Sequence, residues 1–386
     1  MNYQKAPFPW FGGKTKAAPA VWAALGNVDH YVEPFAGSLA NLILRPHEPN
    51  RTYHSETVND LDGLLVNVWR SIQMSPEATA EAASWPVTEA DVHARHCALV
   101  RWRAEQQLEH LMGDPLWHDP IMAGWWLYGQ CAWIGSGWCS GRGPWAPDET
   151  GRLVRSGGGG VNRKRPHLGD DGMGVHRPQM REAGIHCKRP HLGNDGQGVH
   201  RPQMREAGAD LHAMTMPELL RWFDFLSARL RHVRIVNGSW ERVCTSGALK
   251  ILSVRGAKAD KFAGVFLDPP YRVTGTRDAN LYAEDEGDKL SADVYQWCLE
   301  FGAHDWLRIV LAGFEGEHDG LTAAGWREVE WYEAGFLQGG MNNARKAGDK
   351  NTQRKERLWM SPACLDVGAV GAADVAPSTL FAGAAK

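Results

Sequence analysis

Residues 265–271 read Val-Phe-Leu-Asp-Pro-Pro-Tyr, an apolar run that ends in an acid and two prolines. Such a run predicts a buried strand that brings the carboxylate of Asp268 to its end. Proline lacks an N–H group and holds φ near about −65°, so Pro269 and Pro270 cannot continue a strand ladder and their carbonyls point outward. The segment therefore offers rigid hydrogen-bond acceptors beside an aromatic ring, that of Tyr271.

This combination suits the activation of an amino group on a nucleobase. That nitrogen is a poor nucleophile because its lone pair is delocalised into the ring. If the Asp268 side chain and the Pro269 carbonyl each accept one of its N–H bonds, the nitrogen becomes pyramidal and the lone pair is freed. A base stacked on Tyr271 would gain about 1–3 kcal/mol. The alternative is that Asp-Pro-Pro-Tyr only ends a strand and begins a loop.

Outward from this segment, strands and helices alternate in both directions. The pattern predicts an α/β fold, with a doubly wound, mostly parallel Rossmann-like sheet covered on both faces. Sheets of this kind bind ligands at the carboxyl ends of their strands. Strands are expected at 31–35, 232–236, 264–267, 307–312, 328–336 and 356–360, and helices at 60–74, 88–111, 217–231 and 290–301.

Composition excludes several classes of protein. The chain has 386 residues, of which 43% are hydrophobic and 23% charged, so it can bury a large core and is not disordered throughout. Its seven cysteines are scattered and odd in number, which favours a reducing compartment and makes the cytoplasm the expected location. The most apolar stretch, 121–135, is shorter than the roughly 18 residues of a membrane span, so no membrane role is expected.

The middle of the chain is repetitive and basic. Residues 164–184 recur at 188–208 with only two differences, in a Gly-, Pro- and His-rich unit that predicts a duplicated surface loop. Eleven basic and five acidic residues give the stretch 151–208 a charge of +6, which leaves −9 for the rest of the chain. A basic stretch in an acidic body is typical of contact with a polyanion. The candidate phosphate contacts are Arg163, Lys164, Arg165, Arg177, Lys188, Arg189 and Arg201.

Two alternatives apply to this stretch. It is either a nucleic-acid contact, in which one or two arginines read guanine edges, or a solvated loop with no specific role. The repeats also hold histidines, but their spacing of nine fits no usual zinc finger, and no metal is expected. The tryptophans and tyrosine at 125–138 indicate a small hydrophobic core rather than a surface for stacking bases.

Three motifs together resemble a known family. They are Pro-Trp-Phe-Gly-Gly-Lys at 9–14, Val-Glu-Pro-Phe-Ala-Gly at 32–37, and Asp-Pro-Pro-Tyr at 268–271. In this order they resemble the W-x-G-G-K, E-P-F-x-G-x-G and D-P-P-Y motifs of the Dam-type (D12 class) S-adenosylmethionine-dependent adenine-N6 DNA methyltransferases, of the phage or prophage type. The resemblance covers roughly 6–75 and 230–360. Leu39 stands where the family usually has a second glycine.

The resemblance implies a discontinuous catalytic domain and a set of ligands. The domain would comprise residues 1–75 and 217–361, with a DNA target-recognition insert at 76–216 and a disordered tail at 362–386. It further implies S-adenosylmethionine as cofactor, S-adenosylhomocysteine as product, no metal, and double-stranded DNA as partner. The chain would act as a monomer or homodimer in DNA methylation, in a restriction-modification or prophage setting.

The resemblance also assigns residues to the cofactor. Glu33 would receive its ammonium group, while Gly37 would let the backbone approach. Asp60 would take the ribose hydroxyls, although a helix N-cap explains this acid or Asp62 equally well. Trp240 would stack on the adenine or else belong to the core. The full cofactor set is Trp10, Gly12, Gly13, Lys14, Glu33, Pro34, Phe35, Gly37, Asp60, Trp240 and Asp268, and the catalytic set is Asp268, Pro269, Pro270 and Tyr271.

The expected reaction is one direct displacement on a flipped adenine, in which the activated amino nitrogen attacks the cofactor methyl group. The nearest alternative is methylation of cytosine at N4, which has the same amine chemistry. Methylation of protein glutamine or RNA guanine uses a similar tetrapeptide, often with Asn first, and Asp268 with the basic stretch favours DNA over both. A catalytically inactive DNA-binding relic is the alternative from another functional class.

Overall fold

The computed structural model describes a defined part of the chain, and the statements below concern that part. The candidate DNA contacts at 163–201, both repeats, Tyr271, and residues 367–386 of the expected tail lie outside it. The described residues are 3–10, 12–46, 55–105, 107–133, 138–139, 146–147, 153–154, 211, 214–249, 261–270, 284–330 and 356–366.

A seven-stranded sheet forms the centre of the fold, in the order β5-β2-β1-β6-β7-β9-β8. The pairs among β5, β2, β1, β6 and β7 are parallel, while β9 runs antiparallel to both β7 and β8. The expected α/β fold with a mostly parallel sheet is confirmed. The strands are β1 (His30–Glu33), β2 (Ser55–Asp60), β5 (Val233–Asn237), β6 (Ala263–Leu267), β7 (Leu307–Phe314), β8 (Arg327–Glu330) and β9 (Glu356–Met360), with β3 (Ala146–Pro147) and β4 (Leu153–Val154) as a separate antiparallel pair.

The winding direction of the sheet reverses beside β1. From β1 the chain adds β2 and then β5 on one side, and afterwards adds β6 and β7 on the other. His30 pairs with Ser55 of β2 and also with Ala263 of β6, so all three strands are in close register. In open α/β sheets such a switch point is where ligands bind, outside the carboxyl ends of the strands. The loops that follow Glu33 and Leu267 leave the sheet at this point.

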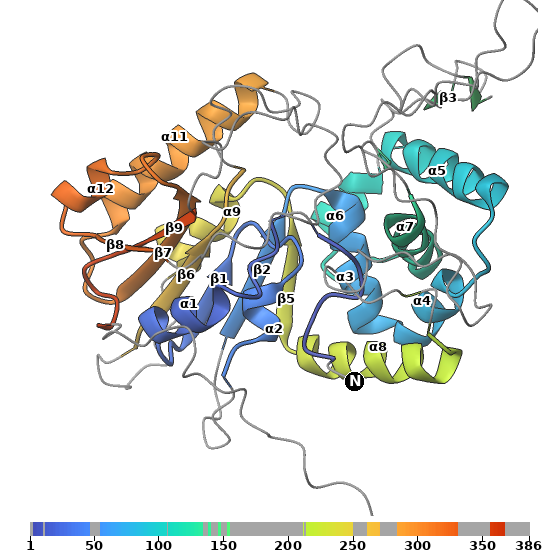
Figure 1. Cartoon of the computed structure of the whole chain (residues 1–386), viewed down its shortest axis with the longest axis horizontal. Coiled ribbons are helices and arrows are strands. Elements are labelled where there is room, and N and C mark those ends of the chain that lie inside the picture. The colour runs from blue at the N-terminus through green and yellow to red at the C-terminus, as the bar shows by residue number, and fades with distance from the viewer. Residues whose placement is uncertain are drawn as a thin grey trace, which may run out of the picture.

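Helices cover both faces of the sheet, as its fully buried strands require (Figure 1). Successive residues of a strand face opposite sides, so Tyr31 and Phe266 belong to one core while Val32 and Val265 belong to the other. The first core packs against α1 (Ala18–Leu25), α2 (Ala40–Ile43), α3 (Gly63–Met74) and α8 (Met216–Leu230). The second packs against α9 (Glu241–Cys244), α10 (Ser246–Leu249), α11 (Glu284–Phe301) and α12 (Gly320–Ala323).

Four further helices gather beside α3 and α8, at the β5 side of the sheet (Figure 1). Trp126 and Leu127 join the first core, while Tyr128 and Trp133 form a small cluster with Val92. The expected aromatic core is thereby confirmed, and it is divided between the core of the sheet and this small cluster. The four helices are α4 (Pro76–Ala83), α5 (Glu89–Ala104), α6 (Gln107–Gly113) and α7 (Pro120–Ala132).

Three expected helices have different bounds, and the one expected at 290–301 begins at Glu284 as α11. The helix expected at 60–74 begins only at Gly63, because Asp60 is the last residue of β2 and the Asp62 side chain caps the helix by accepting from Leu64 N. The helix expected at 88–111 is divided into α5 and α6.

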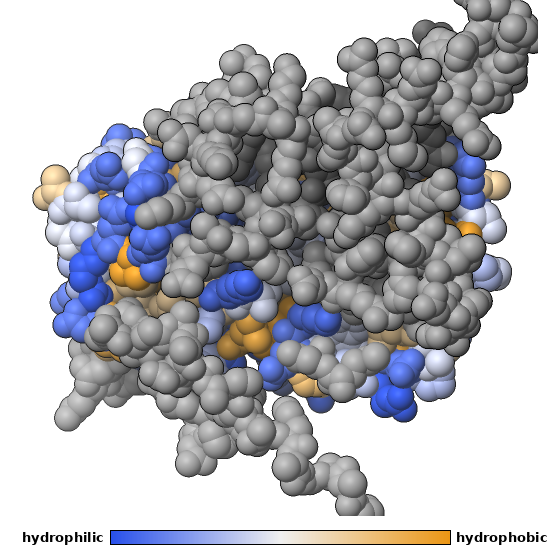
Figure 2. Space-filling view, viewed as in Figure 1, coloured by the Kyte–Doolittle hydropathy of each residue, from blue (hydrophilic) through white to orange (hydrophobic). Residues whose placement is uncertain are grey.

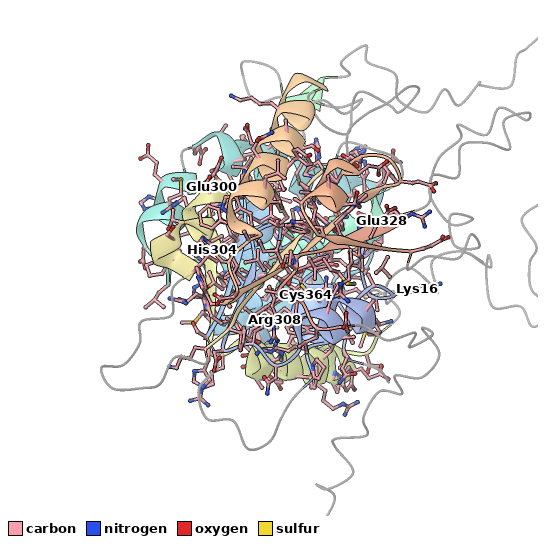
Figure 3. The ribbon with its side chains drawn as sticks, turned by 90° about the vertical axis from the view of Figure 1, so that its left-hand side faces the viewer. Lys16, Glu300, His304, Arg308, Glu328 and Cys364 are labelled. Carbon is pink, nitrogen blue, oxygen red and sulfur yellow. The ribbon has the colours of Figure 1, made fainter. Side chains whose placement is uncertain are left out.

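The boundary of the expected tail at 362 is also corrected. Cys364 is buried, and Leu365 N donates to Ala24 O at 2.9 Å, so the chain remains packed on α1 after β9 ends. Figure 3 shows Cys364 close to Arg308, whose guanidinium donates to Leu25 O at 2.7 Å. The packed body therefore extends through 366.

The described surface around α11 and α12 is largely hydrophilic (Figure 2). Arg357 of β9 is itself buried and forms ion pairs with Glu315, Glu328 and Glu330. Within the described ranges, none of the helices combines the length and the apolar character needed to cross a membrane.

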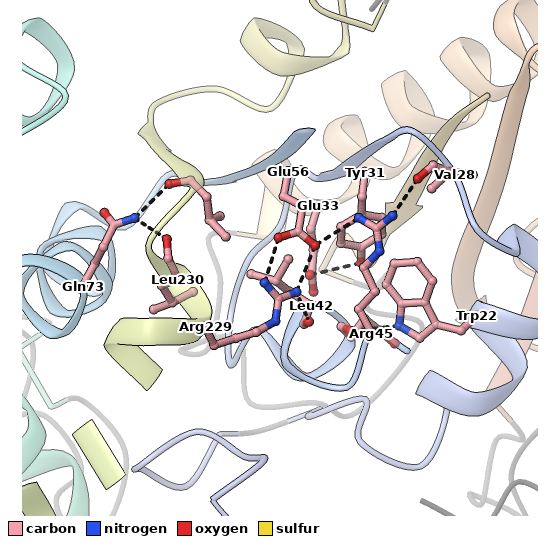
Figure 4. Close-up of polar contacts among 12 residues, drawn as sticks. Trp22, Val28, Tyr31, Glu33, Leu42, Arg45, Glu56, Gln73, Arg229 and Leu230 are labelled. Carbon is pink, nitrogen blue, oxygen red and sulfur yellow. Dashed lines mark hydrogen bonds and ion pairs between the residues drawn. The ribbon is translucent and has the colours of Figure 1, made fainter. Parts of the chain in front are cut away.

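A buried ion cluster holds β2 against α8 (Figure 4). Both Glu56 oxygens accept from Arg229, at 2.7 and 2.9 Å, and Arg45 lies 3.0 Å from one of them. Each arginine also binds a carbonyl, that of Leu42 or Val28. Burial alone would raise the pKa of Glu56, but the hydrogen bonds and charges of the two arginines hold it below its usual value. The cluster is strongly coupled because one acid serves two buried cations.

Replacing the shared acid tests this cluster. Glu56→Gln leaves two buried arginines without a counter-charge, and we expect a loss of about 3–5 kcal/mol in the free energy of unfolding, measured with urea at pH 7. The loss shrinks as the pH falls, because protonation of Glu56 removes the same charge from the wild type. The control is Glu300→Gln on the exposed face of α11, which should change stability by less than about 0.5 kcal/mol. A loss below 1 kcal/mol for Glu56→Gln would contradict the assignment.

Candidate functional site

The first and last of the three motifs meet at the switch point. Lys14 Nζ lies 3.0 Å from Asp268 Oδ1, and it donates to Gly12 O at 2.8 Å. Glu356 Oε2 lies 3.8 Å from the same nitrogen. Lys14 is 4% exposed, so it is not a solvated surface lysine. Residues at opposite ends of the sequence therefore form one ion pair at the carboxyl end of β6.

Glu33 ends β1, the neighbour of β6, and is buried beside Asp268. Its Oε2 accepts from the Tyr31 hydroxyl at 3.1 Å (Figure 4). Burial raises the pKa of Glu33 to about 8, against the effect of the Tyr31 hydrogen bond, and the charge of Asp268 adds to the rise. A buried acid of this kind becomes fully charged only when a positive group comes near.

The loop after β1 is fixed around Gly37. Its N–H donates to Asp60 Oδ2 at 3.0 Å, and its carbonyl accepts from Trp69 Nε1 at 2.9 Å. The φ of Gly37 is 47°, and a Cβ atom there would lie 2.8 Å from Trp10 Nε1. Only glycine fits both the left-handed backbone and the close ring. A Cβ atom on Gly13 would lie 3.7 Å from Ser38 Oγ, so the first motif packs over this loop.

Asp60 holds this loop from β2. One of its oxygens accepts from Gly37 N and the other from Asp62 N at 2.9 Å. Burial raises the pKa of Asp60 to about 6, although both N–H groups lower it. Asp60 is therefore not the helix N-cap, which is Asp62. The contacts of Asp60 fix the loop after β1, and its role toward a ribose stays a prediction.

Sequence reasoning missed Asn59, which joins three strand ends. Its Nδ2 donates to Pro34 O at 3.1 Å and to Gly238 O at 2.9 Å, while its main-chain carbonyl accepts from Ala36 N. These bonds tie the loops after β1 and β5 to β2. The signal was an amide side chain next to Val58 in a buried strand, since buried polar groups need partners.

Trp240 belongs to the core, one of the two roles left open for it. It is 5% exposed and stacks on Phe35, with ring centroids 6.2 Å apart and an interplanar angle of 28°. The ring of Trp297 lies edge-on to it at 6.0 Å. Phe35 is partly buried against the same core, so the second motif is anchored from this side as well.

The Asp-Pro-Pro segment at 268–270 follows β6 directly. Pro269 is buried, whereas Asp268 and Pro270 are half-buried at the same edge as Glu33. The expected partners Tyr271 and the basic residues at 163–201 lie outside the described residues, so their placement stays a prediction. Among the residues that the structure describes, no group of three His, Cys, Asp or Glu side chains is arranged to hold a metal ion.

The fold and site define a class: an α/β protein with an acid-rich site at the switch point of a doubly wound sheet. Comparison with family models gives no match for this chain, and comparison with curated proteins gives none either. The activity of this chain is therefore inferred from the geometry and charges of the site.

Leu39 occupies a backbone conformation that favours glycine. Its φ and ψ are 52° and 27°, while its side chain is completely buried. A left-handed conformation costs a non-glycine residue about 1–2 kcal/mol. The glycine that the resembled family has here would avoid this cost, and Leu39 compensates by filling the core.

This strain predicts a reversed order of two substitutions. Leu39→Ala and Leu39→Gly should both destabilise the protein by about 3–5 kcal/mol, because each opens a cavity. The glycine variant should nevertheless be at least as stable as the alanine variant, because it relieves the backbone. At Leu42, which is equally buried but helical, glycine should be the worse by about 1 kcal/mol. Urea unfolding of the four variants checks this, and the same order at both positions would contradict it.

The raised pKa of Glu33 predicts a pH-dependent stability. Between pH 4.5 and about 8 the folded state keeps a proton that the unfolded state releases, so the free energy of unfolding falls as the pH rises. Glu33→Gln has no titratable group at this position, so its free energy of unfolding does not fall in this way. The difference between the variant and the wild type should therefore shift in favour of the variant by about 3 kcal/mol from pH 5 to pH 7.5. Thermal or urea unfolding at both pH values measures it, with exposed Glu81→Gln as the control. An equal difference at the two pH values would refute the assignment.

Proposed function

We propose that this chain is a DNA methyltransferase that transfers the methyl group of S-adenosylmethionine to the N6 amino group of adenine. The supporting observation is the convergence of the three motifs at one sheet edge. Lys14 of the first pairs with Asp268 of the third at 3.0 Å, and Glu33 of the second lies beside them. A strand-to-loop stop would not require a buried lysine from the start of the chain.

The residues at this edge fit a positively charged cofactor. S-adenosylmethionine carries a sulfonium and an ammonium group, and supplies a methyl group activated for displacement. Glu33 would hold the ammonium, and the positive charge would lower the raised pKa of this acid on binding. Gly37 makes room for the Trp10 ring, which packs where a side chain of residue 37 would lie and so closes the loop on that side. Asp60 fixes the loop and would face the ribose.

Asp268 and Pro269 would orient the target amine. The Asp268 carboxylate and the Pro269 carbonyl each accept one N–H bond, which concentrates the lone pair on nitrogen. Nitrogen then forms a bond to the methyl carbon while the carbon–sulfur bond breaks, and its electron pair stays on sulfur as the neutral thioether of S-adenosylhomocysteine. The surplus proton leaves the methylated nitrogen for solvent. Lys14 fixes the position of the Asp268 carboxylate during this step.

Target recognition would belong to residues 76–216, inserted between the two parts of the catalytic domain. The charge of +6 at 151–208 suits contact with DNA phosphates, and the adenine would be flipped out of the duplex to reach Asp268. One described helix of this region, α7, contacts the first motif: Gln130 donates to Pro9 O at 3.1 Å. The region proposed for target recognition would therefore be in direct contact with the motif proposed for cofactor binding.

Removing the Asp268 carboxylate tests the function. Asp268→Ala should lower methyl transfer to DNA by about 10²–10⁴-fold, because the amine loses the group that activates it. Cofactor binding, followed by calorimetry, should weaken far less than methyl transfer, because Glu33, Gly37 and the other residues assigned to the cofactor remain. Asp305→Ala, in an exposed loop, is the control for a lost acid and should keep full activity.

The product identifies the substrate base. Transfer of a radiolabelled methyl group to plasmid DNA, followed by mass spectrometry of the nucleosides, should yield N6-methyl-2′-deoxyadenosine. N4-methyl-2′-deoxycytidine would instead assign the related cytosine reaction, and cofactor binding without any transfer would indicate an inactive DNA-binding relic. Full activity of Asp268→Ala would refute the site.

A further inference from the structure

One arginine joins two segments that are far apart in the sequence. Arg103, in the last turn of α5, places Nη2 at 2.6 Å from Asp62 Oδ1. Its Nη1 donates to Cys139 O at 3.2 Å. A guanidinium presents its donors in a rigid planar fork, so these two bonds fix the distance between Asp62 and Cys139. A lysine has a single nitrogen and could not maintain the same span.

From Asp62 the contacts continue into the cofactor loop. Asp62 N donates to Asp60 Oδ1 at 2.9 Å, and Asp60 Oδ2 accepts from Gly37 N at 3.0 Å. Asp62 also caps α3 through Leu64 N. Arg103 is thus separated from the Gly37 backbone by two carboxylates, each held by short hydrogen bonds.

On its other side, Arg103 holds a strained residue. Cys139 is buried and has a φ of 58°, which is unusual for a residue with a side chain. Its N–H donates to His96 Nδ1 at 3.2 Å, while its carbonyl accepts from Arg103, so both main-chain polar groups of Cys139 are hydrogen-bonded. In the sequence, Cys139 immediately precedes the residues that lead to the basic stretch at 151–208.

We propose that Arg103 is a positioning residue that couples DNA binding to cofactor binding. This inference rests on the proposed function. A shift of Cys139 when DNA binds would move the guanidinium of Arg103. That movement would alter the positions of Asp62 and Asp60, and through them the loop at Gly37. Because coupling between sites is reciprocal, DNA then strengthens cofactor binding as much as the cofactor strengthens DNA binding.

The test measures cofactor affinity in two conditions. S-adenosylmethionine is titrated calorimetrically into the full chain, alone and in the presence of saturating linearised plasmid DNA. For the wild type we expect DNA to tighten binding by about 5–150-fold. In Arg103→Ala the ratio should fall to near one. In Arg103→Lys the ion pair with Asp62 persists but the span to Cys139 is lost, so affinity without DNA should stay near that of the wild type while the DNA effect disappears.

Two matched variants separate coupling from charge and from folding. Arg101→Ala removes an exposed arginine on the same helix, whose Nε donates to Cys97 O within α5, and it should keep the wild-type ratio. Asp62→Asn keeps the helix cap but loses the ion pair, and it should resemble Arg103→Ala. Thermal unfolding shows whether each variant folds. If Arg103→Ala does not fold, the test uses Arg103→Lys instead.

The outcomes distinguish this proposal from the function on which it rests. A wild-type chain that binds no S-adenosylmethionine would overturn the proposed function and the coupling with it. A wild type that binds the cofactor equally with and without DNA would overturn the coupling alone. The same holds if Arg103→Ala or Arg103→Lys keeps the wild-type ratio. Loss of the ratio in Arg101→Ala would show that general charge, rather than the Arg103 fork, is responsible.

Discussion

The position of β1 between β2 and β6 is the constraint from which the site follows. Because all three strands are parallel and nearly in register, their carboxyl ends lie at one edge. That edge receives Glu33, Asp60 and Asp268, one acid from each strand or the loop after it. A register shift of a single residue would turn each side chain to the other face of the sheet. Buried apolar residues on both faces prevent such a shift, so the same packing that stabilises the sheet also positions the acids.

Bringing acids together at a partly buried edge has an electrostatic cost. Burial raises the pKa of Glu33 to about 8 and that of Asp60 to about 6, so neither is as readily charged as in water. Lys14 offsets part of this cost at Asp268, and backbone N–H groups do so at Asp60. Glu33 keeps its proton near neutral pH because its pKa is raised, and it would become charged only beside a positive group. Under the proposed function, this acid would therefore suit a positively charged cofactor better than an anionic one.

The sequence correctly predicted the strands and acids that depend on local residue patterns. It did not predict the features that depend on tertiary contacts. Apolar runs ending in an acid located β1 and β6, and with them Glu33 and Asp268. The bounds of α3 were wrong because an acid at 60 and an acid at 62 look alike in sequence, and only the structure shows which one caps the helix. Asn59 and Arg103 were missed, since their partners lie in distant segments. Trp240 could be assigned to the core only once Phe35 and Trp297 were seen around it.

Backbone strain shows how the network around the cofactor loop is held. In the described part of the chain, the non-glycine residues with positive φ are Leu39 and Cys139. Such conformations cost about 1–3 kcal/mol each and persist only where surrounding contacts over-determine them. Leu39 lies two residues after Gly37, and Cys139 lies at the other end of the contacts that run through Asp62 and Arg103. One end of this hydrogen-bonded path is therefore strained, and a second strained residue lies two positions beyond the other end. The contacts along the path are what hold these conformations, because an isolated residue would relax from them.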